Sequence, residues 1–244
     1  MTSNQNIKLD EIMSNKLKDL TKKGKDFTYL INNKNSIDEI NGLLISISEV
    51  FNKTECEELI NISETMNYEK PLMFPRNLDK SLKNVQRISD KNIKKGNNNY
   101  ENTIRDCQRL MIDSDPFAKV LEKKLIHIIP KTINKNNGFC YKFEYINPRF
   151  RFLKYEDSGH FIRHKDESYI SKKNEKSLIT ILIYLNDDYQ GAYTRFFSDP
   201  YDKVGLSLTP ETGMVCLMQQ DIEHEVPKIE SGIKYVIRTE IMYS

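Results

Sequence analysis

The sequence has no long apolar run, no large excess of charge of one sign and no closely spaced pair of cysteines. No run approaches the ~18 apolar residues of a membrane-spanning helix, so a membrane partner is not expected. The polar N-terminus is not followed by the apolar segment of a secretory signal peptide. We therefore expect a soluble, intracellular and most simply cytoplasmic protein.

The balance of charge and the cysteine spacing exclude further classes. Lysine and arginine number 37 against 35 acidic residues, a net charge of +2, so no nucleic-acid partner is expected. The four cysteines contain no C-x-x-C pair, which excludes a zinc ribbon. Free buried thiols are expected rather than disulfides for Cys56, Cys107, Cys140 and Cys216.

A length of 244 residues suits one sizeable domain with an appendage. Residues 1–36 are expected to form a leader, either a short amphipathic helix or a partly disordered segment. Residues 37–244 are expected to form a single domain. Its first part, 37–135, supplies helical support and a loop, and its second part, 136–244, supplies a β core.

The pattern of the first part, residues 37–135, predicts a strand followed by helices. A strand is expected over 41–51. Thr54 as N-cap with Glu57 three residues later forms a capping box, which predicts a helix over 54–66. Two more helices are expected over 100–112 and 117–129.

The residues of the long polar stretch 67–102 allow two interpretations. It is a loop that covers a substrate, or an ordinary surface insertion.

From Gly138 onward the pattern changes to short strands separated by turns. Polar and apolar residues alternate in two of them, and 178–185 is a nearly continuous apolar run, as expected of a buried strand. Together the segments predict an α+β protein whose β part is a sandwich or barrel. The strands are expected over 140–145, 149–155, 178–185, 194–197, 213–218 and 233–243.

A histidine and a carboxylate stand one residue apart at His164 and Asp166. In a strand, residues i and i+2 point to the same face, so both side chains can reach one ion. An isolated H-x-D is usually a solvated surface pair. With a second histidine, however, the set becomes the two-histidine, one-carboxylate arrangement of non-heme Fe(II) oxygenases.

The other three histidines are candidates for the missing ligand. His224 is the only histidine downstream of His164, and we expect it to be the third ligand. His127 falls in a predicted helix and is expected to be structural. His160 is expected in a turn and lacks a carboxylate two residues on.

Two cations, Lys234 and Arg238, lie four residues apart in the last predicted strand and therefore share a face. If that face is solvent, they need no partner. If it faces the interior, an anionic ligand is expected to pair with one of them. Val236 between them favours a partly buried face.

These segments together resemble the Fe(II)/2-oxoglutarate-dependent dioxygenases, and among them the prolyl 4-hydroxylase family. The order H-x-D, a long gap, one histidine and a basic residue ten positions later is typical of that family. Four stretches carry the likeness most strongly, and the E-C-x-x-L-I helix near 54–66 fits more loosely. The four stretches are 151–168, 177–186, 210–213 and 232–240.

The resemblance implies a double-stranded β-helix (jelly-roll) core with N-terminal packing helices. It implies that His164, Asp166 and His224 hold Fe(II) and that Lys234 binds the C5 carboxylate of 2-oxoglutarate. Tyr155 and Tyr184 match tyrosines that line the cosubstrate site, and Arg238 either helps to fix that site or is structural.

The implied reaction is hydroxylation of peptidyl-proline to 4-hydroxyproline, with O2 as second cosubstrate, release of succinate and CO2, and L-ascorbate as activator. The implied partner is a protein or peptide that contains proline. One departure concerns the family's G-G-E-T-x-F segment, which here has Ala192 and Tyr193. This departure leaves open another side chain or a small molecule as target. A separate alternative is a non-catalytic jelly-roll binding module.

Overall fold

A computed structural model describes residues 34–36, 43–70, 104–134 and 138–244. Within these ranges the chain is mainly β-structure with two helices, α3 (Lys53–Glu64) and α5 (Asp115–Leu125). The strands are β1 (Lys34–Ser36), β2 (Leu44–Ile47), β3 (Arg105–Asp106), β4 (Gln108–Asp113), β5 (Thr132–Asn134), β6 (Cys140–Ile146), β7 (Arg149–Tyr155), β8 (His160–His164), β9 (Lys176–Tyr184), β10 (Gln190–Gly191), β11 (Thr194–Phe197), β12 (Leu206–Leu208), β13 (Val215–Gln219), β14 (Glu223–Val226), β15 (Ile229–Ser231) and β16 (Lys234–Tyr243).

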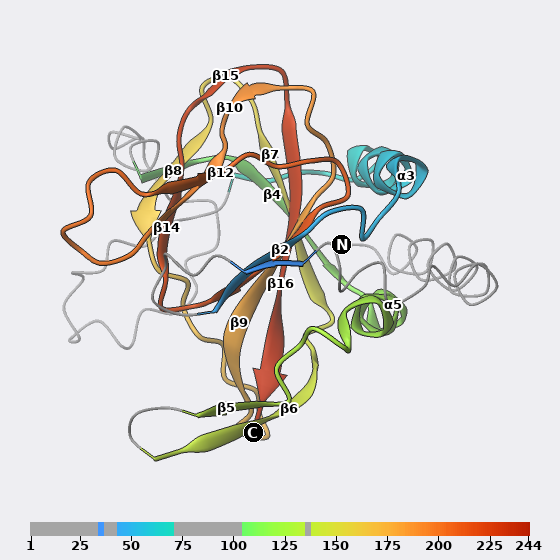
Figure 1. Cartoon of the computed structure of the whole chain (residues 1–244). Coiled ribbons are helices and arrows are strands. Elements are labelled where there is room, and N and C mark those ends of the chain that lie inside the picture. Colours follow the sequence, from blue (N-terminus) through green and yellow to red (C-terminus); the bar gives the residue numbers. More distant parts are fainter. Residues whose placement is uncertain (1–33, 37–42, 71–103, 135–137) are drawn as a thin grey trace, which may run out of the picture.

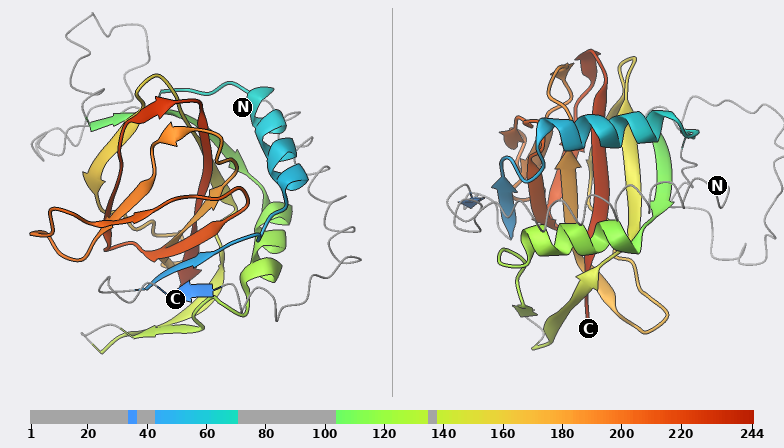
Figure 2. Two further views of the ribbon diagram at one scale, coloured as in Figure 1. Left: turned by 45° about the horizontal axis from the view of Figure 1, so that its top comes forward. Right: turned by 90° about the vertical axis from the view of Figure 1, so that its right-hand side faces the viewer.

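Two antiparallel sheets dominate the described part of the chain. The larger has nine strands, in the order β1-β2-β13-β9-β16-β6-β5, with β7 also paired to β16 and β4 paired to β7. The smaller has five strands, in the order β12-β11-β14-β8-β3. The two sheets curl toward each other and enclose an interior (Figures 1 and 2). The predicted α+β fold with a jelly-roll core is confirmed.

Apolar side chains form two separate clusters, one on each face of the larger sheet. One cluster packs α3 and α5 against the outer face and includes Leu59, Leu121 and Phe150. The second fills the interior between the sheets and includes Tyr184 and Phe196. Figure 2 shows both helices on the same outer side of the sheet. The helices therefore support the larger sheet from outside and contribute no side chains to the interior cluster.

Helix α3 confirms the helix predicted over 54–66, but the predicted capping box was wrong. The N-cap is Asn52, whose side chain accepts a hydrogen bond from the backbone N–H of Glu55 at 2.9 Å. The Glu55 carboxylate accepts one from the N–H of Asn52 at 2.7 Å. Two overlapping signals occur here, N-x-x-E and T-x-x-E, and asparagine outranks threonine as an N-cap.

Helix α5 confirms the helix predicted over 117–129, with both ends shifted. Its N-cap is Ser114, which accepts a hydrogen bond from the N–H of Phe117, and Pro116 lies in the first turn. The helix ends at Leu125, so His127 lies in the turn beyond it, exposed rather than within a helix.

The helix predicted over 100–112 was wrong from Arg105 onward. Residues 105–106 and 108–113 form β3 and β4, and β4 pairs with β7. Leu110 and Ile112 alternate with exposed residues and face the helices, which is the period of a strand. The spacing of these apolar residues suited either structure, and pairing with β7 decided it.

Other predictions were confirmed or lie outside the described residues. The six strands predicted after Gly138 all occur, and the four cysteines form no disulfide, although Cys140 is exposed. Residues 34–36 pair with β2, and the remainder of the predicted leader and nearly all of the predicted loop 67–102 lie outside the described ranges. None of the helices in those ranges is long and apolar enough to cross a bilayer.

Candidate metal and cosubstrate site

Strand β8 carries His164 into the interior through an irregularity in its pairing with β14. His164 pairs with His224, whereas Phe161 pairs with Val226, so β8 has one extra residue in this interval. Such a bulge changes which face a side chain points to. As a result Phe161 stacks on the His164 ring, with ring centroids 3.5 Å apart. His160 was predicted in a turn and instead opens the strand.

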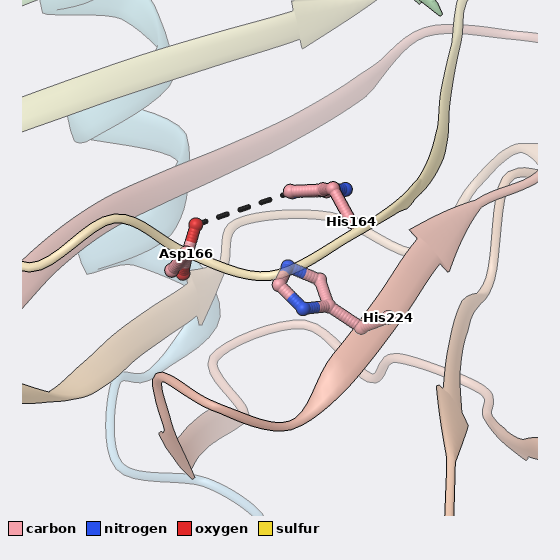
Figure 3. Close-up of side chains that lie close together, drawn as sticks. All are labelled: His164, Asp166 and His224. Carbon is pink, nitrogen blue, oxygen red and sulfur yellow. Dashed lines mark ion pairs between the residues drawn. The ribbon is translucent and has the colours of Figure 1, made fainter. Parts of the chain in front are cut away.

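The structure brings His164, Asp166 and His224 together. Their candidate ligand atoms all lie within 4.8 Å of one another. The His164 Nε2 and Asp166 Oδ1 atoms are 4.0 Å apart, and the two imidazole centroids are 4.2 Å apart. His164 and His224 come from neighbouring strands, and Asp166 follows the end of β8 (Figure 3). His160 is not part of this group.

Both imidazoles are oriented by backbone carbonyls. The Nδ1 atom of His164 lies 2.8 Å from the Ile162 carbonyl oxygen, and that of His224 lies 3.2 Å from the Ile222 oxygen. If each Nδ1–H donates there, each Nε2 keeps a free lone pair for a metal ion. Burial lowers the pKa of His164 to about 3 and also lowers that of His224, so both are neutral, as ligands must be.

Asp166 is held by two donors that leave it charged. Its Oδ2 accepts a hydrogen bond from Thr180 at 2.6 Å, and its Oδ1 lies 3.0 Å from the Arg238 guanidinium. Burial opposes ionisation, but Arg238, His224 and Thr180 together lower the pKa of Asp166 to about 2. Two neutral imidazoles and one carboxylate fit an Fe(II) ion better than a structural zinc site rich in thiolates.

Lys234 is fully buried, with 1% of its surface exposed. Its ammonium group donates one hydrogen bond, to the Ala192 carbonyl oxygen at 2.6 Å. An ammonium has three donors, and within the described ranges no carboxylate pairs with this one. Burial therefore lowers the pKa of Lys234 to about 7. An uncompensated buried cation of this kind suits a carboxylate that arrives with a ligand.

Three tyrosine rings surround the Lys234 ammonium. It lies 5.7 Å from the centroid of Tyr155, 5.4 Å from that of Tyr184 and 5.9 Å from that of Tyr189. The Tyr184 hydroxyl is hydrogen-bonded to Thr194 at 2.9 Å. The buried Tyr189 hydroxyl has no partner among the described residues. The predicted neighbours Tyr155 and Tyr184 are thus next to Lys234, and Tyr189 offers a donor that a ligand can use.

Arg238 shares its face of β16 with Lys234 but has a different environment. Besides Asp166, its guanidinium lies 3.5 Å from Glu240, and Arg151 lies 2.7 Å from the same carboxylate. Arg238 is thus bound to a proposed iron ligand. It does not lie beside Lys234. The sequence left open whether Arg238 fixes the cosubstrate site or is structural, and its contact with Asp166 points to a third role, the positioning of a proposed metal ligand.

Several residues of this site were missed by sequence reasoning. Thr180 and Tyr189 belong to segments that were read only as a buried strand and its turn, and Arg151 and Glu240 only as parts of strands. Arg151 and Glu240 did carry a signal in the sequence, because each is a charged residue within a predicted strand that is rich in apolar residues, and a buried charge needs a partner.

A separate surface cavity of about 420 Å³ lies on the outer face of the smaller sheet. Arg195 and Glu225 line it, and in the β11–β14 pairing they alternate with the inward-facing Phe196 and His224. The cavity is therefore separated from the proposed metal ligands by the sheet itself.

Comparison with known proteins is consistent with this geometry. Residues 150–239 match the model of the 2OG-Fe(II) oxygenase superfamily. A prolyl-4-hydroxylase from Pseudomonas putida superposes with a TM-score of 0.51 at 14% identity, covering 81% of this chain and 91% of that one. A Trichoplax adhaerens prolyl hydroxylase, solved with a hypoxia inducible factor peptide fragment, gives 0.55 at 14% identity and covers 88% of both chains.

At this identity the structural matches establish the fold alone. No curated protein sequence matches the chain significantly. The family model nevertheless spans the strands that carry His164, His224 and Lys234, so the resemblance noted from the sequence is confirmed.

Proposed function

From this resemblance and the geometry of the site, we propose that the protein is an Fe(II)- and 2-oxoglutarate-dependent dioxygenase that hydroxylates peptidyl-proline to 4-hydroxyproline. The observation that carries the proposal is the pairing of two features in one interior. One is the His164, Asp166 and His224 group, and the other is the buried Lys234 ammonium without a carboxylate partner in the described ranges.

In this proposal each side chain has a distinct task. His164, Asp166 and His224 hold the iron, and Arg238 and Thr180 keep the Asp166 carboxylate ionised and oriented. Lys234 binds the far carboxylate of 2-oxoglutarate. When bound, the iron and its cosubstrate supply the oxidation that hydroxylates the substrate, with O2 consumed and succinate and CO2 released.

The segment around Ala192 supports a cosubstrate role for Lys234. Ala192 adopts φ = +45°, a region that favours glycine, and is fully buried. Its carbonyl oxygen is the acceptor that holds Lys234. The strained backbone therefore positions the ammonium group of Lys234, so alanine at this position is compatible with the proposed anion site.

The choice of proline as target is supported by the family resemblance and by the solved relatives. The Trichoplax adhaerens protein was solved in complex with a peptide fragment, so a protein of this fold can bind a peptide. We extend this to the present protein as a proposal, with a proline-containing peptide or protein as substrate.

The proposal predicts a product that can be measured directly. Purified protein with Fe(II), 2-oxoglutarate, O2 and L-ascorbate should form succinate and add one oxygen atom to proline peptides, followed by mass spectrometry. His164→Ala should abolish both products because it removes a ligand. His160→Ala, in the same strand but outside the group, is the matched control and should retain them.

Turnover that survives in His164→Ala would show that the ligands are misassigned. Succinate formed in the wild-type protein without any hydroxylated proline would keep the chemistry and reject proline as the target.

A further inference from the structure

Four arginines gather on the inner side of the β-structure near the proposed iron ligands. They are Arg105 on β3, Arg109 on β4, Arg151 on β7 and Arg238 on β16. Arg151 and Arg238 are directly opposite in the β7–β16 register. Arg109 pairs with Leu153, two residues from Arg151 on the same face of β7, and is therefore its diagonal neighbour.

The carboxylates of this region are already occupied. Glu240 accepts from Arg151, lies beside Arg238 and also accepts a hydrogen bond from Asn147 at 3.0 Å. Asp166 is bound by Arg238 and Thr180 and is a proposed metal ligand. These two acids balance two of the four arginines.

The other two arginines, Arg105 and Arg109, form no ion pair with a carboxylate among the described residues. Burial opposes the charge of Arg105, but nearby groups, Cys107 first and Asp166 among them, raise its pKa. Arg105 donates to the Cys107 sulfur at 3.0 Å, and its guanidinium lies 4.8 Å from the Phe161 centroid. Since Phe161 stacks on His164, this arginine connects the cluster to the proposed metal site. Arg109 has neither contact. Burial lowers its pKa, and the nearby guanidinium groups of Arg105, Arg151 and Arg238 lower it further.

The position of Arg109 suits a ligand that enters from solvent. Met111, two residues further along β4, is 40% exposed, whereas Cys107, two residues before Arg109, is 5% exposed. Arg109 lies between them and is half-buried. The backbone of Arg109 is paired with that of Glu69 through hydrogen bonds of 2.8 and 3.0 Å, so it is the half-buried side chain that is available to a ligand, next to the interior that contains the proposed iron ligands.

Neither iron nor 2-oxoglutarate removes this excess of positive charge. Fe(II) adds two charges of the same sign. In the proposed function, the two carboxylates of 2-oxoglutarate go to the iron and to Lys234, at the other end of the same face of β16. Gathering unpaired guanidinium groups in a half-buried position is unfavourable unless an anion joins them.

We propose that Arg109 binds a carboxylate of the substrate, so that the enzyme selects a proline with an acidic group close to it. This rests on the proposed function and names its substrate class more closely. A guanidinium fork binds a carboxylate through two parallel hydrogen bonds, and a half-buried position strengthens them. The carboxylate can come from an aspartate or glutamate of a peptide, or from a free C-terminal proline.

The proposal is tested by binding of matched peptides to the full-length protein with Fe(II) and 2-oxoglutarate in the absence of O2. One N-acetylated, C-amidated fluorescent peptide carries aspartates on both sides of a proline, and a second carries asparagines instead. Fluorescence anisotropy gives the two dissociation constants. A third arm compares free L-proline with L-prolinamide as competitors, and so separates a side-chain carboxylate from a terminal one.

We expect the acidic peptide, or L-proline among the competitors, to bind at least about tenfold more tightly than its neutral counterpart. Arg109→Gln should remove this preference and Arg109→Lys should retain part of it. Arg149→Gln is the control. Arg149 lies in the same β4–β7 pairing, but it already donates two hydrogen bonds to the carboxylate of Asp113. This variant should leave the preference unchanged.

Equal affinity for acidic and neutral ligands in the wild-type protein, or a preference that survives in Arg109→Gln, would overturn the carboxylate site. The visible band of the protein with Fe(II) and 2-oxoglutarate, recorded on the same samples, tests the proposed function separately. A normal band without a carboxylate preference rejects the inference alone, whereas an absent band rejects the proposed function.

Discussion

The two cations of β16, Lys234 and Arg238, lie on one face of one strand, but their charged partners differ. At the lysine end, formed by Lys234 and the three tyrosines around it, the cation has a backbone acceptor and no carboxylate within the described ranges. At the arginine end, formed by Arg238, Asp166 and Glu240, the cation lies between two fixed carboxylates. Val236 lies between the two ends.

This difference separates a binding group from a positioning group. A buried cation without a fixed partner costs free energy until an anion arrives, so the lysine end is suited to a ligand that comes and goes. A cation already paired with Asp166 gains little from a ligand, but it keeps that carboxylate ionised and oriented. Substitutions at the two ends should therefore impair different binding steps.

The largest effect is expected from Lys234→Met. Without the ammonium, the far carboxylate of 2-oxoglutarate would be buried without a counter-charge, a loss of about 3 kcal/mol or more, over a hundredfold in affinity. Iron binding should be unchanged. Anaerobic titration with 2-oxoglutarate at saturating Fe(II) measures this, and Lys154→Met, on the opposite face of β7, is the control. Unchanged 2-oxoglutarate affinity in Lys234→Met would contradict the assignment.

Arg238→Met should weaken iron instead. Asp166 loses its charged partner, which raises its pKa and frees its orientation, and Fe(II) affinity should fall about 10- to 100-fold. The measurement is a competition titration with a metal-binding dye. Once iron is saturating, 2-oxoglutarate affinity should be close to that of the wild-type protein. A loss confined to 2-oxoglutarate would place Arg238 at the cosubstrate instead.

Affinity for 2-oxoglutarate should depend on pH through Lys234. Its pKa of about 7 in the free protein means that the ammonium is present below pH 7 and is lost above it. Binding of a carboxylate favours the charged form, so above pH 7 complex formation must take up a proton. Affinity should then fall by up to about tenfold per pH unit, and should change little below pH 7 for this reason.

Dissociation constants measured from pH 6 to pH 9 test this dependence. Lys234→Arg keeps its charge throughout this range, and any residual binding by that variant should lose the dependence. An affinity in the wild-type protein that stays constant up to pH 9 would show that Lys234 is not the titrating partner.

The smallest effect is expected from Tyr189→Phe. Its hydroxyl is buried without a partner among the described residues, so removing it should not destabilise the free protein. If the hydroxyl donates to the cosubstrate, 2-oxoglutarate affinity should fall by about 1 kcal/mol, roughly fivefold. Thermal unfolding and the anaerobic titration separate the two quantities. Lower stability with unchanged affinity would assign Tyr189 to packing.

The sequence predicted most where chemistry is tied to local spacing. The H-x-D pair and the shared face of Lys234 and Arg238 follow from short-range patterns, and His224 was chosen because it is the only histidine downstream of His164. The β core was predicted because its strands alternate or form continuous apolar runs. The jelly-roll arrangement itself came from the family resemblance, since the pattern alone allowed a sandwich or a barrel.

What could not be predicted depends on register between strands far apart in the chain. Glu240 meets Arg151 only because β7 and β16 pair, and Thr180 reaches Asp166 only because β9 lies beside them. Residues 105–112 were predicted as part of a helix because their local spacing suits either structure. The extra residue in β8 that turns Phe161 and His164 to one side also has no local signature.

The central claim, that this interior binds Fe(II) and 2-oxoglutarate together, is tested most directly by anaerobic titration of the wild-type protein with both. We predict a visible charge-transfer band when both are present, no band with either one alone, and none in His224→Ala. A folded, freshly metal-loaded wild-type protein that shows no band, or a His224→Ala variant that retains it, would contradict the claim.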